Sequence, residues 1–281
     1  MRVQQQLAAS IAKRPLGGYA AEGPVASEPV AWAAVALHRA GHAGPADSAC
    51  RWLAESQSAD GSVGVTRSEP APAWPTALAI YAWTTVAPGR FADPIARALD
   101  WGLSVQGETM PRRDNIGHDP SLLGWSWAAA THAWLEPTSF FVRALDAAGH
   151  ANHPRAQQGR RLLVDRLLPE GGANYGNTMV LGQTLLPHVQ PSGIVMWALP
   201  THDAADPRVG KTLDWLEASL APDLATASLA FASLGLAAHG RGAAKSRPLL
   251  LTAAQSLLAN NGSLYRRALV LAALNSTPGE G

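Results

Sequence analysis

The densest group of side chains capable of chemistry lies between residues 124 and 138. Two acid–base groups, His132 and Glu136, fall in this stretch, and either can donate or accept a proton. Glu28, which directly precedes a proline as Glu136 does, is a possible second carboxylate. A glutamate at a helix start can equally serve only to stabilise that start. Glu136, His132 and Glu28 are therefore candidate catalytic residues with a structural role as the alternative.

Glu28 and Glu136 belong to a phrase that recurs along the chain. It consists of a polar or aromatic residue, a proline, a small residue and then a run rich in Ala and Leu, and its four clear prolines are Pro29, Pro75, Pro137 and Pro191. Proline suits the first helical turn because its missing N–H is not needed there, and it disfavours helical geometry in the residue before it. With two weaker copies lacking proline, the phrase predicts helices over 29–40, 75–85, 137–148, 191–199, 225–238 and 263–274.

A second series of helices lies between these, more charged and with a single apolar stripe. It is predicted over 3–14, 46–57, 94–105, 155–168, 207–219 and 246–259. The Pro-led helices are apolar nearly all round and so need neighbours on every side, whereas the second series needs only one.

Six inner helices ringed by six outer ones would satisfy both requirements. We therefore expect an all-α fold, an (α/α)6 toroid formed as a single domain by residues 1–281, with an insertion at about 106–130 as a lid or binding loop. An open solenoid is the alternative, but it would leave one face of each inner helix exposed.

The toroid would gather the starts of its inner helices at one rim. Six positive helix ends there favour an anionic group or developing negative charge. The residues that directly precede proline should meet at the same rim: Glu28, Trp74, Glu136 and Gln190.

Aligning the repeats on proline predicts which side chains face inward. The position seven residues after proline holds alanine in the four copies with proline and in the fifth copy, which indicates close helix contact. The position one residue before this alanine, and the position three residues before that one, vary in chemistry. Positions whose side chains differ this much are not packed in the same way in every repeat, so we assign them to a ligand-binding lumen. The alternative is that these side chains only fill the centre of the toroid. Together with aromatic and polar residues of the rim, the expected substrate-binding residues are Trp32, Trp74, Tyr81, Trp127, Trp134, Phe140, Arg143, Gln190, Trp197, Phe231 and Tyr265.

Turns of the Gln…Gly type follow helices of the second series, as at Gln57–Gly61, Gln106–Gly107 and Gly171–Gly176. With these turns the chain resembles the prenyltransferase and squalene-cyclase repeat family, and the resemblance implies an α/α toroid that binds isoprenoids. The chain departs from that family in three respects. Val63 and Ala173 stand where the family's turn usually has Trp, and the Asp-x-Asp-Asp motif and the zinc ligands of its enzymes are absent.

The nearest acidic groups to that motif are Asp203-Ala204-Ala205-Asp206 and the pair Asp114 and Asp119. His118, with Asp114 and Asp119, could bind a metal or simply form a solvated loop. Cys50 is the single cysteine and lies on a predicted outer helix, so neither an internal disulfide nor the family's zinc site is expected. We expect no cofactor.

The charge and hydropathy of the sequence limit the classes of binding partner that we expect. The chain has 22 basic and 21 acidic residues, a formal net charge of +1, which disfavours nucleic acid or an anionic membrane as the main partner. No stretch approaches the ~18 apolar residues of a membrane span, and the N-terminal residues lack the apolar segment of a signal peptide. A small molecule as partner and a cytoplasmic location are expected, and the sequence leaves the oligomeric state open.

Three functions fit these features. The leading one is a terpene-cyclase-like enzyme that cyclises or rearranges an apolar isoprenoid by acid–base chemistry in the central cavity. An alternative is a carbohydrate-active toroid, a glycoside hydrolase or lyase, because tryptophan platforms with two carboxylates suit glycoside chemistry. The third is a toroid that binds a ligand without catalysis.

Overall fold

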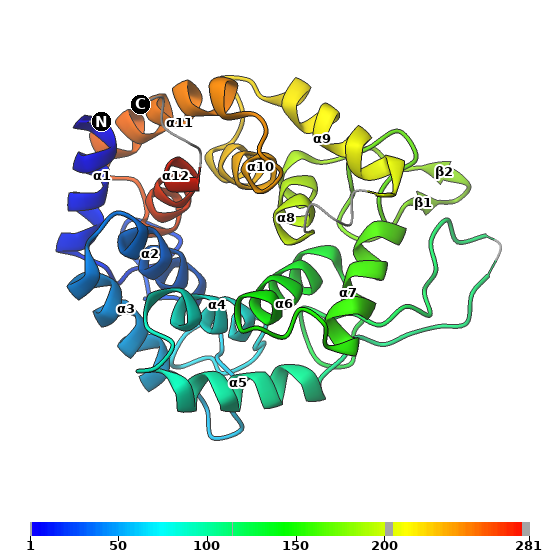
Figure 1. Ribbon diagram of the computed structural model, residues 1–281, viewed down its shortest axis with the longest axis horizontal. Coiled ribbons are helices and arrows are strands. Elements are labelled where there is room, and N and C mark those ends of the chain that lie inside the picture. Colours follow the sequence, from blue (N-terminus) through cyan, green and yellow to red (C-terminus); the bar gives the residue numbers. More distant parts are fainter. Residues whose placement is uncertain (1, 114, 200–204, 277–281) are drawn as a thin grey trace. The chain divides into compact units, whose positions relative to one another are not determined.

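The computed structural model describes residues 2–113, 115–199 and 205–276. They form twelve α-helices and one two-stranded hairpin (Figure 1). The Pro-led series and its two weaker copies are α2 (Ser27–Arg39), α4 (Thr76–Val86), α6 (Leu135–Ala147), α8 (Val189–Ala198), α10 (Thr226–Ala238) and α12 (Leu264–Ser276). The second series is α1 (Arg2–Lys13), α3 (Ala43–Glu55), α5 (Ala92–Ser104), α7 (Pro154–Asp165), α9 (Pro207–Ser219) and α11 (Ala243–Ala259). The hairpin joins β1 (Met179–Val180) to β2 (Gln183–Thr184).

The predicted helices are confirmed, with one correction at their starts. Helices α2, α6 and α8 each begin two residues before their proline, so the residue preceding proline is already helical. Proline as the third helical residue loses no hydrogen bond, because the first turn has no internal acceptor for its N–H. Glu28, Glu136 and Gln190 are consequently the second residues of their helices.

The helices pack within two compact units. The first runs to Ser104 and resumes at Arg247, and the second spans Val105–Ser246. In the first unit, α12, α2 and α4 lie in a row covered by α1, α3 and α5; in the second, α6, α8 and α10 lie in a row covered by α7 and α9. We call the two rows of Pro-led helices the apolar rows. Their members meet neighbours laterally and through their covering helices, as their all-round hydrophobicity requires.

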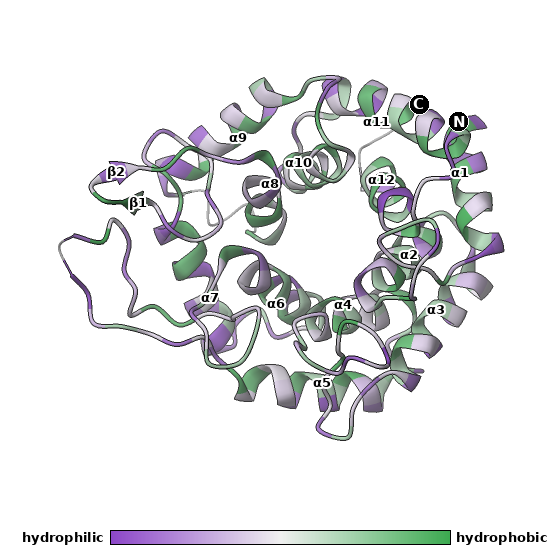
Figure 2. Cartoon of the chain, turned by 180° about the vertical axis from the view of Figure 1, so that it is seen from behind, coloured by the Kyte–Doolittle hydropathy of each residue, from purple (hydrophilic) through white to green (hydrophobic). Residues whose placement is uncertain are grey.

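Burial separates the two series as predicted. Residues 27–37 of α2 and 191–198 of α8 are buried without interruption. The covering helices bury one face only, for example Ala46, Ala49, Cys50 and Leu53 in α3. Figure 2 shows the same contrast, since the covering helices carry both hydrophilic and hydrophobic segments. The alanines predicted to mark close helix contact are all buried: Ala36, Ala82, Ala144, Ala198 and Ala232.

Helices α8 and α10 approach each other closely in the second unit. A Cβ atom added at Gly193 would lie 2.5 Å from the carbonyl oxygen of Phe231, and one at Gly235 would lie 2.5 Å from the oxygen of Gly193. Neither position can carry a side chain without moving a helix. These glycines therefore set the spacing between the two helices.

A repeated hydrogen bond joins the turns to the helix starts. The hydroxyl of the residue after proline accepts the backbone N–H of a turn residue in three repeats. The donor–acceptor pairs are Val63 N to Thr76 Oγ1 at 2.8 Å, Trp125 N to Thr138 Oγ1 at 3.0 Å, and Ala173 N to Ser192 Oγ at 2.8 Å. We call this contact the hydroxyl latch. All three pairs are buried, so the latch satisfies backbone groups that water cannot reach.

Two glycine turns lead into the latches. Gly61 and Gly171 have φ angles of +93° and +95°, which favour glycine. A Cβ atom would lie 2.3 Å from the carbonyl oxygen of Arg97 at Gly61, and 2.6 Å from that of Lys211 at Gly171. Each turn therefore lies directly against the next covering helix, α5 or α9.

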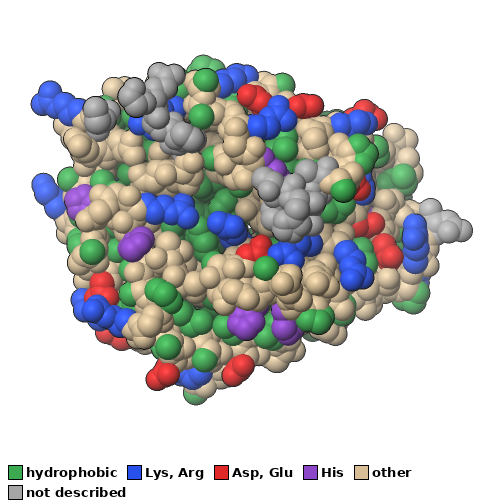
Figure 3. Space-filling view, viewed as in Figure 1, with side chains coloured by type: hydrophobic (Ala, Val, Ile, Leu, Met, Phe, Trp, Pro, Cys, Tyr) green, Lys and Arg blue, Asp and Glu red, His purple; other side chains and the backbone are tan. Residues whose placement is uncertain are grey.

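Within the described part of the chain, no helix combines the length and apolarity needed to cross a lipid bilayer. On the face seen in Figure 3, basic and acidic side chains are interspersed, in keeping with the near-neutral charge of the sequence.

The latch at Thr138 is expected to contribute to stability. Thr138→Val keeps the shape of the side chain but leaves the buried Trp125 N–H without its acceptor, which should lower the free energy of unfolding by about 1–3 kcal/mol. Chemical denaturation measures this change. Thr252→Val is the matched control, because Thr252 is an exposed threonine within α11. Equal unfolding free energies for the two variants would contradict a stabilising latch.

Candidate functional site

Two side chains from adjacent Pro-led helices meet in the second unit. Glu136 and Gln190 are the second residues of α6 and α8, and the Gln190 Nε2 donates a hydrogen bond of 3.2 Å to Glu136 Oε1. Glu136 is 8% exposed. The structure thus brings together two of the residues predicted to share a rim, within this unit.

Two backbone hydrogen bonds fix the start of α6. Trp134 N donates to Trp125 O at 3.0 Å, and Leu135 N donates to Tyr175 O at 3.2 Å. Gly176 lies against the Trp134 ring, since a Cβ atom there would be 3.1 Å from it. The turn and the loop that carry the latch residues therefore also position the residues that flank Glu136.

Burial alters the acidity of Glu136. Desolvation raises the pKa of its carboxyl above the ordinary value, and the hydrogen bond from Gln190 lowers it by a smaller amount. A buried carboxyl of raised pKa retains its proton closer to neutral pH, which suits a general acid. The arrangement can therefore deliver a proton from Oε1 or Oε2 to a basic atom of a bound molecule.

The other predicted residues of this unit divide into exposed and buried groups. His132 is exposed, and its Nδ1 lies 3.4 Å from Glu108 O. Trp127 and Trp134 are half-buried. Arg143 lies over the Trp197 ring at 5.4 Å from its centroid, a cation–π contact. Phe140 and Phe231 are buried in their helices.

Glu28 has its own partners in the first unit. It is 6% exposed, and Tyr19 donates its hydroxyl proton to Glu28 Oε2 at 2.7 Å. The rings of Tyr19 and Tyr265 lie edge to face at 5.1 Å, so the second residues of α2 and α12 converge on Tyr19. Sequence reasoning missed Tyr19, which lies in the irregular segment after α1 and belongs to no repeat.

The remaining predicted residues of the first unit lie along its apolar row. Trp32 and Tyr81 pack edge to face at 6.4 Å, and Arg39 donates to the Tyr81 hydroxyl at 2.8 Å. Trp74 is half-buried just before α4. The lumen assignment stays a prediction. Of its aromatic members Tyr265 is half-buried, and the others are at most 4% exposed: Trp32, Tyr81, Phe140, Trp197 and Phe231.

The residues considered for a metal do not form a cluster. No three His, Cys, Asp or Glu side chains among residues 2–113, 115–199 and 205–276 are placed to hold an ion. Asp119 accepts two hydrogen bonds from Ser121, which hold its pKa low, and its N–H donates to Asp165. Asp114 lies outside the described residues. Cys50 is buried, and burial raises the pKa of its thiol to about 12, so it does not offer a thiolate.

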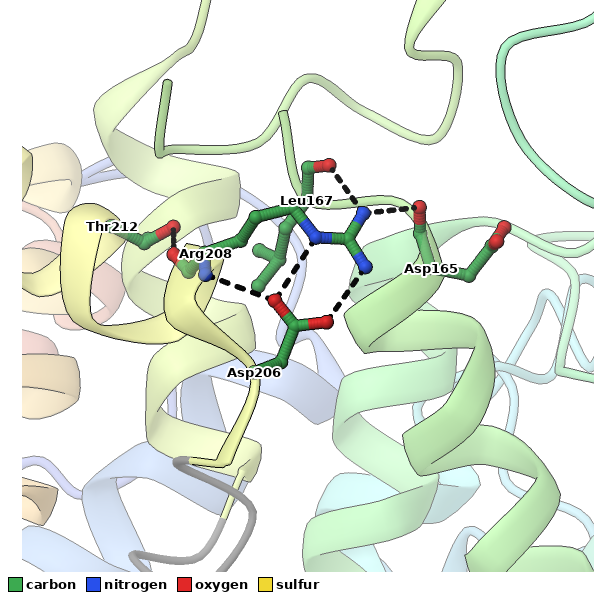
Figure 4. A network of polar contacts seen from close by, with 5 residues as sticks. All are labelled: Asp165, Leu167, Asp206, Arg208 and Thr212. Carbon is green, nitrogen blue, oxygen red and sulfur yellow. Dashed lines mark hydrogen bonds and ion pairs between the residues drawn. The ribbon is translucent and has the colours of Figure 1, made fainter. Parts of the chain in front are cut away.

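The segment 203–206 is the nearest match to the acidic motif of the cyclases, and its described aspartate, Asp206, has a structural role. Asp206 caps the start of α9 by accepting the Arg208 N–H at 2.9 Å, and it pairs with the Arg208 guanidinium. Arg208 also donates to the carbonyl oxygens of Asp165 and Leu167, as Figure 4 shows. These contacts lower the pKa of Asp206, so it is not a proton donor near neutral pH. Asp203 lies outside the described residues.

No protein-family model matches the sequence, and no curated protein matches it. Solved structures do share its fold. One, described as a wild-type glycosidase, is 14% identical and aligns over 99% of this chain and 97% of its own length, with a TM-score of 0.62. Another is a type II terpene cyclase from Scytonema in complex with its product merosterolic acid A. It is 15% identical and aligns over 80% of this chain and 66% of its own, with a TM-score of 0.52.

These similarities confirm the predicted fold class, since the all-α chain matches the α/α toroid folds of both enzymes. At such identities they concern the fold alone. The resemblance to the cyclase repeat family is thus supported at the level of the fold, and the fuller match is to the glycosidase.

The raised pKa of Glu136 predicts a pH-dependent stability. The folded chain binds this proton more tightly than the unfolded chain, so the stabilisation is complete below the ordinary value of 4.5 and is lost as pH rises through the folded pKa. Glu136→Gln removes this loss. The free energy of unfolding of the variant minus that of the wild type should therefore increase across that window, measured by denaturation at several pH values.

Glu170→Gln serves as the control, because Glu170 is an exposed carboxylate of the same unit. If Glu136→Gln and the wild type lost stability in parallel with rising pH, the pKa of Glu136 would not be raised.

Proposed function

We propose that the chain is a carbohydrate-active enzyme that cleaves glycosidic bonds, with Glu136 as the proton donor. The observation that carries the proposal is the buried Glu136 carboxyl, which accepts a hydrogen bond from Gln190 at the start of α6 and whose pKa is raised by desolvation. The full-length fold similarity to a glycosidase supports it.

The acidity of Glu136 favours a glycosidic oxygen over an alkene as the proton acceptor. A leaving-group oxygen needs a general acid whose pKa lies near the working pH, which burial of a carboxyl provides. An alkene is a far weaker base and needs a stronger acid. The raised pKa of Glu136 therefore fits protonation of a glycosidic oxygen better than protonation of an alkene.

In this proposal Trp134, which directly precedes α6, and Trp127, in the loop before it, offer aromatic faces to a sugar ring; both are half-buried. His132 assists proton transfer. Glu28, in the first unit, stays a candidate catalytic carboxylate because it lies one residue before proline in its own helix, as Glu136 does.

The role of Glu136 as an acid predicts a dependence on the leaving group. Glu136→Gln should reduce kcat/KM for unactivated oligosaccharides by about 10²–10⁴, the usual contribution of a general acid. The dinitrophenolate of a dinitrophenyl glycoside leaves without needing a proton, so kcat/KM for these substrates should fall far less.

Glu170→Gln again provides the control and should cleave both substrates as the wild type does. Equal losses for the two substrates in Glu136→Gln would exclude Glu136 as the acid. Glycan binding without cleavage by a folded wild type would favour a non-catalytic toroid instead.

A terpene-cyclase-like activity on an apolar isoprenoid is a second proposal, supported by the fold similarity to the Scytonema enzyme. Within the second unit, the Trp197 ring beside Arg143 is the kind of aromatic group that such substrates use. Incubation of the wild type with prenyl diphosphates and squalene, followed by mass spectrometry, should yield cyclised products if this proposal holds. Unchanged substrates from a folded sample would refute it.

A further inference from the structure

A small cavity lies at the base of the insertion in the second unit. It has a volume of about 110 Å³ and is lined by Glu108, His118, His132, Trp134, Arg166 and Asn177, among others. The two arms of the insertion are tied together beside it, since Glu108 N donates to Thr131 O and Met110 N donates to Pro120 O. The cavity is therefore held by backbone hydrogen bonds.

Arg166 is the cation of this cavity. It follows α7 directly, is 5% exposed, and donates from Nη1 to Ala133 O at 3.0 Å. Its Nε is buried, and no described residue accepts a hydrogen bond from it. An arginine so deeply buried with an unused donor is costly unless an anion completes its hydrogen bonds.

His118 adds a second unused polar atom. Its Nδ1 is buried without a hydrogen-bond partner among the described residues. Burial, with the nearby charge of Arg166, lowers the pKa of His118 to about 4, so the ring is neutral at physiological pH. It can donate or accept a hydrogen bond there without adding charge.

We propose that this cavity binds a carboxylate group carried by a sugar, so that the substrates of the proposed glycosidic cleavage are acidic sugars. This substrate class rests on the proposed function, whereas the carboxylate site itself rests on Arg166 and His118. Trp134 connects the two, because it lines the cavity and directly precedes α6, which carries Glu136.

The surrounding charges favour a carboxylate over a phosphate. Arg166 supplies one positive charge, and a guanidinium matches the two oxygens of a carboxylate. Glu108 also lines the cavity, and Asp119 and Asp165 act electrostatically on Arg166. These three acidic groups oppose a dianion more strongly than a monoanion, and His132 and His118 are the other titratable groups facing the site.

Calorimetric titration of the wild type with glucuronate, glucose, acetate and inorganic phosphate tests the site. We expect saturable binding of glucuronate that is tighter than binding of any of the other three. The His118 ring resonances should shift during the same titration when followed by NMR. No saturable binding, no movement of His118, equal affinity for glucose, or a preference for phosphate would each overturn the proposal.

Arg166→Lys keeps the positive charge but removes the guanidinium that can bond both carboxylate oxygens. It should weaken glucuronate binding by roughly tenfold or more and leave glucose binding unaffected. Arg161→Lys is the matched control, since Arg161 is an exposed arginine of α7 outside this cavity. Unchanged binding in a folded Arg166→Lys variant would also overturn the proposal. If that variant does not fold, the wild-type titration decides.

Failure of the carboxylate site and failure of the proposed cleavage by Glu136 can be told apart. Glu136→Gln should bind glucuronate as the wild type does, so loss of cleavage with intact binding leaves both proposals standing. If the wild type cleaves no glycoside but binds glucuronate through Arg166, the function fails and the carboxylate site remains.

Discussion

In three repeats the position of the helix start depends on the hydroxyl latch that joins it to the preceding turn. A Thr or Ser hydroxyl one residue after proline accepts a buried backbone N–H from the turn, at Thr76, Thr138 and Ser192. The Thr76 and Ser192 hydroxyls donate their own protons at 2.6 Å to the carbonyl oxygens of Ala73 and His188, so each of them links the turn to the helix start. Proline fixes the backbone of the first turn, and the latch fixes where that turn lies. Glu136 and Gln190 each lie two residues before a latch hydroxyl, and they meet because both helix starts are held.

Burial at a held helix start gives Glu136 its chemical character. A carboxylate at an exposed helix N-terminus is stabilised by the helix dipole and by water. Here desolvation dominates and raises the pKa, and Gln190 offsets only part of that effect. The same logic applies to the small cavity, where burial leaves Arg166 and His118 with unused hydrogen-bonding atoms. At the start of α6 the packing around the apolar row thus excludes water from the Glu136 carboxyl.

Helices and their order could be predicted because apolar periodicity and proline report directly on local conformation. The contact between Glu136 and Gln190 followed from the repeat register, since both precede proline. Other features depend on chain segments that belong to no repeat. Tyr19 reaches Glu28 from an irregular segment, and Arg166 reaches its cavity from the end of α7, where a basic residue looks like an ordinary helix-terminal charge. The latch was visible as Thr76, Thr138 and Ser192 in a column, but composition alone could not identify their turn partners, because hydrogen-bond partners across a loop depend on tertiary packing.

Amide hydrogen exchange at Val63, Trp125 and Ala173 reports whether the latches stay closed in solution. These three N–H groups lie in turns outside helices and strands, yet the latch gives each a buried acceptor. They should exchange as slowly as amides inside α2 and α8, opening only with the surrounding unit. Exchange as fast as that of the exposed loop amides of Ala128 and Ala129 would mean that the latches open freely, and the account of how Glu136 is positioned would be wrong.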